Sequence, residues 1–291
     1  MKASKAIISV CLEVKVMRKL LRSNLRRLAK SKVFWGCSFT LLAYSELILI
    51  STYTNMVRYN ESLPLDSVFF ASFSILGVIL SIVLSLFTGT EYNDGTIRNK
   101  IIIGRTRNQI YLSSFLTCAA AAIFICFTTL FLTDIVGLPL MGQLKMPGST
   151  LRLLLLDGLL LCTAYGAIFN LIGMLSSSKA HTAVISILAA FALLFIGVWI
   201  AQALFQPEMT EALVTGDQGE TAIQMIDNPR YLTGVERDIY QFFYDFLPGG
   251  QCMQFTWTEV AHPWLLALYS AVITLLCNIA GLFIFNRKDI K

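Results

Sequence analysis

Charged side chains are scarce in this sequence. Only 14% of its 291 residues are Asp, Glu, Lys or Arg, whereas 56% are hydrophobic, and the mean hydropathy is +0.67. Soluble domains carry about 25% charged residues. The composition therefore excludes an ordinary soluble protein and indicates an integral membrane protein.

Catalytic motifs are missing as well. The sequence has no GxxxxGK[ST] phosphate loop, no HExxH and no GxSxG, and its only two histidines are His181 and His262. We therefore expect no catalytic residue, no metal site and no cofactor in this chain. If ATP drives a process here, another polypeptide must bind the nucleotide.

None of the seven cysteines has CxxC spacing. Cys11 precedes the apolar runs described below, and only Cys252 lies in the segment expected outside the membrane, so no external disulfide can form within one chain. We interpret the cysteines as small apolar fillers. Those expected within the membrane are Cys37, Cys118, Cys126, Cys162 and Cys277.

Six apolar runs are present, and each is long enough to cross a bilayer. A hydrocarbon core of about 30 Å requires about 20 residues of helix. The sequence therefore predicts an all-α, polytopic membrane protein that forms one transmembrane domain. The predicted spans are residues 33–57, 67–88, 110–135, 151–176, 180–205 and 263–285.

Lysine and arginine are distributed unevenly between the loops. Residues 1–32 hold ten of them and residues 89–109 hold four, whereas residues 206–262 hold nine acids and two arginines. Cytoplasmic loops carry the basic excess, so we expect both termini in the cytoplasm and residues 206–262 outside. Aromatics interleaved with a basic groove are absent, and we expect no nucleic-acid partner.

Residues 9–32 predict an amphipathic helix, because apolar residues recur every three or four positions from Val14 to Leu28. Such a helix lies in the membrane interface with its basic groups on anionic lipid. A basic arm for nucleic acid is the alternative interpretation. The residues expected to contact the membrane are Arg18, Arg22, Arg26 and Arg27.

The polar stretch between the second and third runs predicts a short helix within residues 91–104. The Asn-Asp pair at 93–94 can cap its start, and Gly104 can end it. Ile97 and Ile101 lie four residues apart on one face, which can dock on a partner. An ordinary cytoplasmic loop with the usual basic bias is the alternative.

Three acids fall within the predicted spans. Glu46 lies near the middle of the first, where a charge costs about 2.5 to 3.5 kcal/mol. We expect it to face other helices, either along a translocation path or as a hydrogen-bonded packing residue. Asp134 and Asp157 lie closer to the outer interface, where we expect both to snorkel to water, with a role in transport as the alternative.

The segment 206–262 predicts two short amphipathic helices, at about 208–226 and 235–246. Turn residues separate them at 228–229 and end the second at 248–250. We therefore expect a helical extracellular segment between the fifth and sixth spans.

Three features together resemble the permease subunits of type-2 ABC exporters, in particular the bacterial permeases associated with bacitracin and lantibiotic immunity. They are the basic amphipathic entry helix before six spans, the EYNDGTIRNKIIIGRTR stretch after the second span, and LPGGQ at residues 247–251. The resemblance covers nearly the whole chain, and the polar stretch is its most specific part. The long outer segment departs from the family pattern.

The resemblance implies an elbow helix at residues 9–32 and a coupling helix at residues 91–104 that contacts a separate ATP-binding subunit. Two such subunits, with their ATP and Mg, would drive two permease chains, either a homodimer or a pair of different permeases. Glu46 would lie along the translocation path. The residues implied for coupling are Glu91, Gly95, Thr96, Ile97, Arg98, Asn99, Lys100 and Ile101.

The implied function is export of an amphipathic peptide, drug or lipid across the cell membrane of a bacterium. A non-transporting sensor or immunity scaffold is the alternative, with the acidic outer segment as its receptor surface for an extracellular peptide. A neighbouring ATPase gene would favour the exporter, and a neighbouring histidine kinase without an ATPase would favour the sensor.

Overall fold

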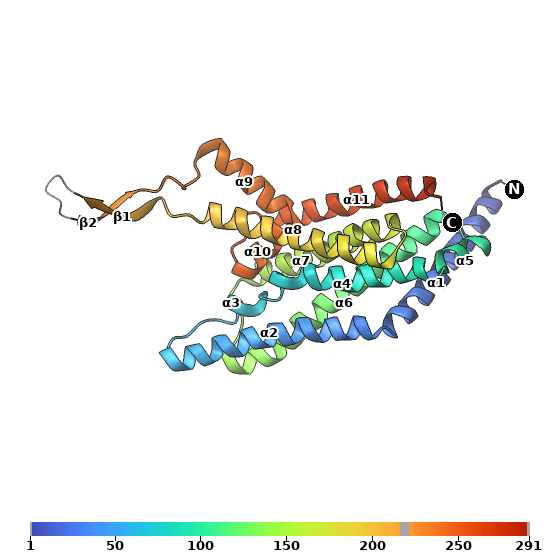
Figure 1. Cartoon of the computed structure of the whole chain (residues 1–291). Coiled ribbons are helices and arrows are strands. Elements are labelled where there is room, and N and C mark those ends of the chain that lie inside the picture. Colours follow the sequence, from blue (N-terminus) through green and yellow to red (C-terminus); the bar gives the residue numbers. More distant parts are fainter. Residues whose placement is uncertain (1, 216–220, 290–291) are drawn as a thin grey trace.

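The computed structural model describes residues 2–215 and 221–289. Within these ranges, six helices are long and apolar enough to cross a membrane, as the six runs predicted. They form an elongated bundle (Figure 1). The helices are α2 (Lys32–Tyr59), α4 (Phe73–Asn93), α6 (Arg107–Met141), α7 (Gly148–Leu175), α8 (Lys179–Leu204) and α11 (Pro263–Arg287).

Several helices begin before the predicted runs, and side-chain caps begin two of them, α2 at Ser31 and α6 at Thr106. The longest, α6, begins three residues before its predicted span. There the Thr106 hydroxyl accepts from the backbone N–H of Gln109, and the Gln109 side chain accepts from that of Thr106. This reciprocal cap satisfies two otherwise unpaired donors. A short helix, α3 (Asp66–Phe69), leads into α4.

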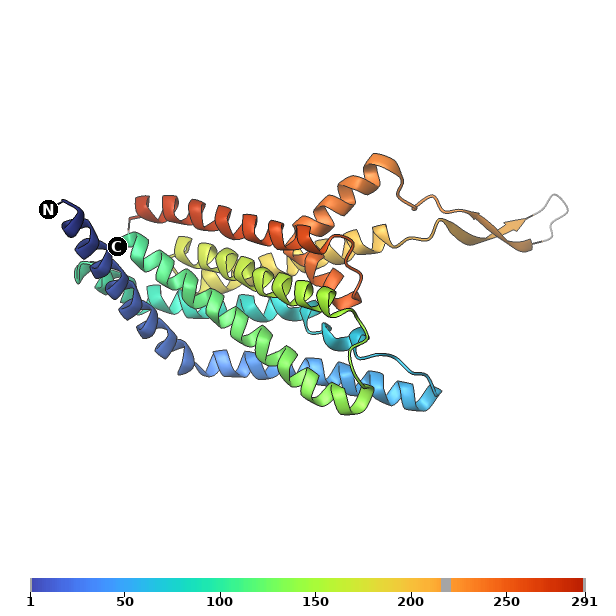
Figure 2. The same cartoon turned by 180° about the vertical axis from the view of Figure 1, so that it is seen from behind.

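The core lies around α4 and α7, while α2 and α8 are largely exposed on their outer sides. α7 packs along α11, α6 and α4, whereas α2 packs mainly on α6. Both ends of the drawn chain lie at one end of the bundle, together with α1 (Lys2–Ala29) and α5 (Thr96–Ile102) (Figure 2). We call this the termini end, and the opposite end the hairpin end.

The prediction for residues 208–226 was wrong. In place of a helix, β1 (Met209–Thr215) pairs antiparallel with β2 (Thr221–Asp227) and projects from the bundle (Figure 1). Met209 lies opposite Asp227. β-branched residues favour strands, and the glycines in the stretch between the strands disfavour a continuous helix. Among the described residues, every regular element other than this hairpin is therefore a helix.

The second outer helix is confirmed as α9 (Gly234–Phe246), which ends before the extended residue Leu247, but residues 248–250 start another helix and do not form a turn. α10 (Pro248–Trp257) begins at Pro248, where proline suits the first helical position. Residues 248–255 are all buried, and α10 packs on α8 and α4. The external position predicted for Cys252 was wrong, because its thiol lies 3.4 Å from the Tyr165 hydroxyl inside the bundle.

A glycine contact lets α10 approach α8. A Cβ on Gly249 would overlap the backbone oxygen of Leu193, and a Cβ on Gly197 would lie 2.5 Å from the Gly249 carbonyl carbon. Backbone atoms cannot move aside as a side-chain tip can. The two helices can therefore pack this closely only because neither position carries a side chain.

We expect Gly249→Ala to lower the free energy of unfolding by about 1 to 3 kcal/mol, because the new methyl group forces the backbones apart. Gly36→Ala is the matched control, since nothing lies within 4 Å of a Cβ there. That change should be neutral or stabilise α2 by up to about 1 kcal/mol. Thermal unfolding in detergent measures both, and equal melting temperatures for the two variants would contradict the close approach.

Candidate functional site

The polar stretch folds into α5, which is shorter than predicted and is bounded by two glycines. Gly95 precedes the helix with φ +64°, and Gly104 follows it with φ +86°, conformations that favour glycine. No side chain caps α5, so the expected cap at 93–94 was wrong. Glu91 belongs to the last turn of α4.

Glu91 is fully buried and holds two cations. Its Oε1 lies 2.7 Å from Arg27 Nη2 and 2.6 Å from Lys100 Nζ. Lys100 also donates to Asn24 Oδ1 at 3.1 Å, and the Arg27 guanidinium lies 4.3 Å from the centre of the Phe87 ring. We call Glu91, Arg27, Lys100 and Asn24 the Glu91 cluster.

The Glu91 cluster joins three separate elements, because Asn24 and Arg27 belong to α1, Glu91 to α4 and Lys100 to α5. The side chain of Lys100 is 12% exposed and that of Arg27 32% exposed. A buried carboxylate is tolerated only when it is paired and hydrogen-bonded. Separating any one of the three elements from the others would therefore expose or unpair a charge.

The apolar side of α5 packs against the chain itself. Ile97 is 1% exposed and contacts a buried cluster that includes Tyr111, Met174 and Phe285, from α6, α7 and α11. Ile101 is half-buried against the same cluster. The expectation that Ile97 and Ile101 dock on a partner was therefore wrong for Ile97, which has no free surface to offer.

The outward side of α5 carries a different set of residues. Ile102, the last residue of α5, and Ile103, which follows it, are 72% and 73% exposed, and Arg98 and Asn99 are exposed as well. Thr96, the first residue of the helix, is half-buried. A second polypeptide at α5 would thus meet an apolar pair and one free cation, with Lys100 already engaged by Glu91.

The structure places α1 against the bundle. Leu20, Asn24 and Leu28 are buried, and α1 contacts α6. Leu25, one of the apolar residues that recur between Val14 and Leu28, is 37% exposed. Of the arginines expected to contact the membrane, Arg18, Arg22 and Arg26 are exposed, whereas Arg27 belongs to the Glu91 cluster.

Two further cations, not anticipated from the sequence, close helix ends at the termini end. Lys288 Nζ donates to the carbonyls of Leu175 and Ser176 at 2.9 Å, and Arg107 Nη1 donates to the carbonyl of Phe285 at 3.0 Å. Burial lowers the pKa of Lys288. Cations at helix C-termini pair with free carbonyls and interact favourably with the helix dipole. These contacts therefore join the end of α7 to the residue after α11, and the end of α11 to the start of α6.

Glu46 faces α6. Its Oε1 accepts from the Thr133 hydroxyl at 3.2 Å, and the Thr133 and Ser45 hydroxyls lie 2.9 Å apart. Its Oε2 is buried without a hydrogen-bond partner. The side chain therefore faces another helix, as expected, and both a path role and a packing role are compatible with this contact.

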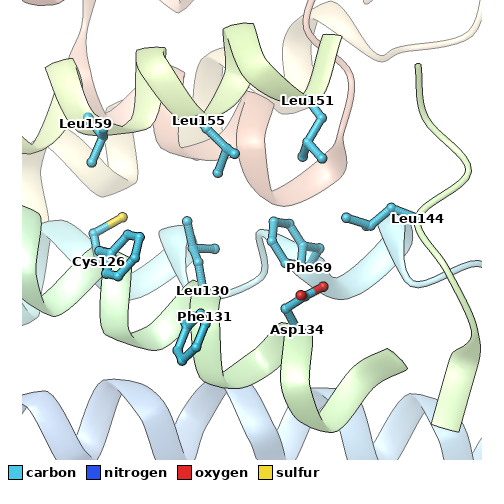
Figure 3. A pocket seen from close by; sticks show the side chains of 10 residues that line it. Phe69, Cys126, Leu130, Phe131, Asp134, Leu144, Leu151, Leu155 and Leu159 are labelled. Carbon is cyan, nitrogen blue, oxygen red and sulfur yellow. The ribbon is translucent and has the colours of Figure 1, made fainter. Parts of the chain in front are cut away.

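The expectation that Asp157 snorkels to water was wrong. Its side chain is 1% exposed, and neither carboxylate oxygen has a hydrogen-bond partner. Asp134 differs, because it is half-buried beside an apolar groove of about 300 Å³ between α6 and α7. Figure 3 shows its carboxylate near Phe69 and Leu144, opposite the leucines of α7.

Replacing Asp157 with leucine is expected to raise the free energy of unfolding by about 1 to 3 kcal/mol, because it removes a buried acceptor without a partner. Asp134→Leu is the control, because this acid is only half-buried. It should change the free energy of unfolding by no more than about 0.5 kcal/mol. Melting of both variants in the same detergent provides the comparison. A less stable Asp157→Leu chain would mean that this carboxylate has a hydrogen-bond partner after all.

The comparisons with models of known protein families and with curated proteins found no match to this chain. Among residues 2–215 and 221–289, no three of His, Cys, Asp and Glu gather as the ligands of a metal ion would. The Glu91 cluster and the outward side of α5 are therefore the features from which a function has to be inferred.

Proposed function

We propose that the chain is the membrane-spanning permease subunit of an ATP-driven exporter of the type-2 ABC class. The observation that carries the proposal is the Glu91 cluster, which ties α5 to both α1 and α4. The outward residues Ile102, Ile103 and Arg98 then form the surface for a separate ATP-binding subunit.

The cluster supports coupling because it makes α5 a rigid extension of two longer elements. A force that moves α5 reaches α4 through the contact of Lys100 with Glu91, and reaches α1 through Asn24 and Arg27. Coupling between distant sites requires such contiguous contacts to an element with two arrangements. The elbow helix and the second span would therefore move together when the ATP-binding subunits close.

The remaining parts of the proposal follow from this assignment. Two permease chains pair, and two ATP-binding subunits hold ATP and Mg, so the chain itself is not an enzyme. It resides in the cell membrane of a bacterium with α5 and both termini in the cytoplasm, and its hairpin outside. The basic excess at the termini end supports this orientation. The expected substrates are amphipathic peptides, drugs or lipids.

Co-purification tests the proposal. The tagged chain is extracted from its native membrane, and the bound polypeptides are identified by mass spectrometry. We expect a soluble ATP-binding subunit in the eluate, together with ATP hydrolysis. Recovery of the chain alone, or with a histidine kinase, would contradict the exporter.

A membrane sensor that binds an extracellular peptide is the second candidate function. The projecting hairpin favours it, because Ile223, Met225 and Ile226 are exposed there, and an isolated two-stranded hairpin is only marginally stable. Deletion of the hairpin would then abolish the response to the peptide, and no ATP-binding subunit would accompany the chain.

A further inference from the structure

A polar pocket lies at the hairpin end, between the end of α8 and helices α9 and α10. Its volume is about 320 Å³, which falls within the range of about 300 to 1,000 Å³ typical of small-molecule sites. Leu204 and Phe205 form part of its apolar wall. Four of its polar residues come from α9 and α10, and three of them, Arg237, Tyr244 and Gln254, share one feature.

These three polar residues each present a buried atom without a hydrogen-bond partner. The atoms are Nη1 of Arg237, the hydroxyl of Tyr244 and Oε1 of Gln254. Tyr244 is 3% exposed and Gln254 is fully buried. Buried polar groups in native proteins are nearly always paired. Three unpaired atoms around one pocket indicate that a polar molecule completes it.

The neighbouring hydrogen bonds hold Gln254 in place. Its Nε2 donates to Asp245 Oδ1 at 2.8 Å and to the Tyr244 carbonyl at 3.1 Å. Asp245 also accepts from Gln241 Nε2 at 2.8 Å and lies 3.2 Å from His262 Nδ1. The amide nitrogen of Gln254 is thus already used, and its oxygen remains as an acceptor for a ligand.

The pocket carries charges of both signs. The Arg237 guanidinium lies 5.5 Å from the centre of the Tyr231 ring and makes none of the ion pairs found in the described part of the chain. Glu259 also lines the pocket. Burial and the nearby carboxylates of Glu259 and Asp245 raise the pKa of Tyr244, so its hydroxyl stays protonated and can donate.

Donors and acceptors therefore meet in one small volume. Arg237 and Tyr244 offer N–H and O–H groups to an anion, while Gln254 and Glu259 offer oxygens to a cationic donor. Water can satisfy the neutral groups, but it cannot neutralise the guanidinium. A ligand that matches all four residues carries a carboxylate and an ammonium group.

We propose that this pocket binds a small zwitterion, either a free amino acid or a short peptide with both termini free. The site is held together by contacts of α8, α9 and α10 at the hairpin end. It does not depend on an ATP-binding subunit at α5, so the failure of one proposal would leave the other unaffected.

Calorimetric titration of the full chain in lipid nanodiscs tests the site. The probes are alanine, dialanine, N-acetyl-dialanine and dialanine amide, so that each charge is removed in turn. We expect alanine or dialanine to bind with millimolar or tighter affinity. Whichever of the two binds more tightly shows whether the ligand is an amino acid or a short peptide. Removing either charge from dialanine should weaken binding about tenfold or more.

Variants assign the two charges to residues. Arg237→Gln should weaken the binding of dialanine about tenfold or more. It should leave the weak binding of dialanine amide unchanged, because the amide has no carboxylate for Arg237 to contact. Tyr244→Phe should also weaken the binding of dialanine. It keeps the aromatic ring, whose centre lies 6.4 Å from that of Phe205. Arg230→Gln removes the same charge from an exposed position outside the pocket and should bind as the wild type does.

Two results would overturn the site. One is the absence of binding by alanine and dialanine at millimolar concentration to a chain that melts normally, which would leave water as the occupant. The other is an equal affinity of the wild type and Arg237→Gln for dialanine.

Discussion

Glu91→Gln is expected to lower the free energy of unfolding by about 3 kcal/mol. Removal of one partner from a buried ion pair typically costs about 3 to 5 kcal/mol, because the other charge stays buried without compensation. Here the Lys100 side chain is 12% exposed and stays in place, whereas Arg27, at 32%, reaches water more easily. The low end of the range therefore applies. Denaturant or thermal unfolding in detergent measures the loss.

Asp94→Asn is the matched control for this change. Asp94 is an exposed acid three residues further along the same segment, and its replacement should change stability by less than about 0.5 kcal/mol. A double-mutant cycle with Lys100→Met should show a coupling energy of about 1 to 3 kcal/mol, since the two side chains share one contact. Strictly additive effects would mean that Glu91 and Lys100 do not interact.

The double change Ile102→Glu and Ile103→Glu is expected to abolish recovery of the ATP-binding subunit. Interface residues that dominate binding contribute about 2 kcal/mol or more each, or roughly a thousandfold for two. Both side chains are more than 70% exposed, so the melting temperature of the chain itself should not change. Co-purification and thermal unfolding of the same preparation separate these two effects.

Ile97→Ala should behave in the opposite way. Ile97 is 1% exposed, and its truncation is expected to cost about 2 to 5 kcal/mol of stability. The control for the charges added by Ile102→Glu and Ile103→Glu is the double change Val235→Glu and Ile239→Glu. It adds the same two charges at exposed apolar positions of α9, at the hairpin end. If that control lost the ATP-binding subunit as completely as the α5 variant did, the docking surface would not be α5.

The membrane-crossing helices could be predicted from the sequence because a span needs only length and apolar composition, both of which are local properties. The hairpin could not, since residues 208–226 mix apolar and polar positions in a way that suits a helix and a strand about equally. α10 was missed for a related reason. Proline and glycine usually mark a turn, but Pro248 starts a helix and Gly249 allows its close contact with α8.

The polar stretch that forms α5 could be singled out from the sequence, but the contacts of its residues could not. Periodicity puts Ile97 and Ile101 on one face, but it does not tell whether that face is covered by a partner or by the chain's own core. One of the two partners of Glu91 could not be predicted either, because Arg27 lies 64 positions earlier and only the folded bundle brings the two together. Asp157 shows the same limit, since its burial depends on neighbouring helices.

Photo-crosslinking from Ile103 tests the central claim most directly. A photoreactive residue is introduced at Ile103 and, as a control, at Val235, which is 75% exposed at the hairpin end. After irradiation of native membranes, we expect an adduct between Ile103 and a soluble ATP-binding polypeptide, and no such adduct from Val235. An efficient crosslinker at Ile103 that captures no ATP-binding polypeptide, or equal capture from both positions, would contradict the coupling of α5 to an ATPase.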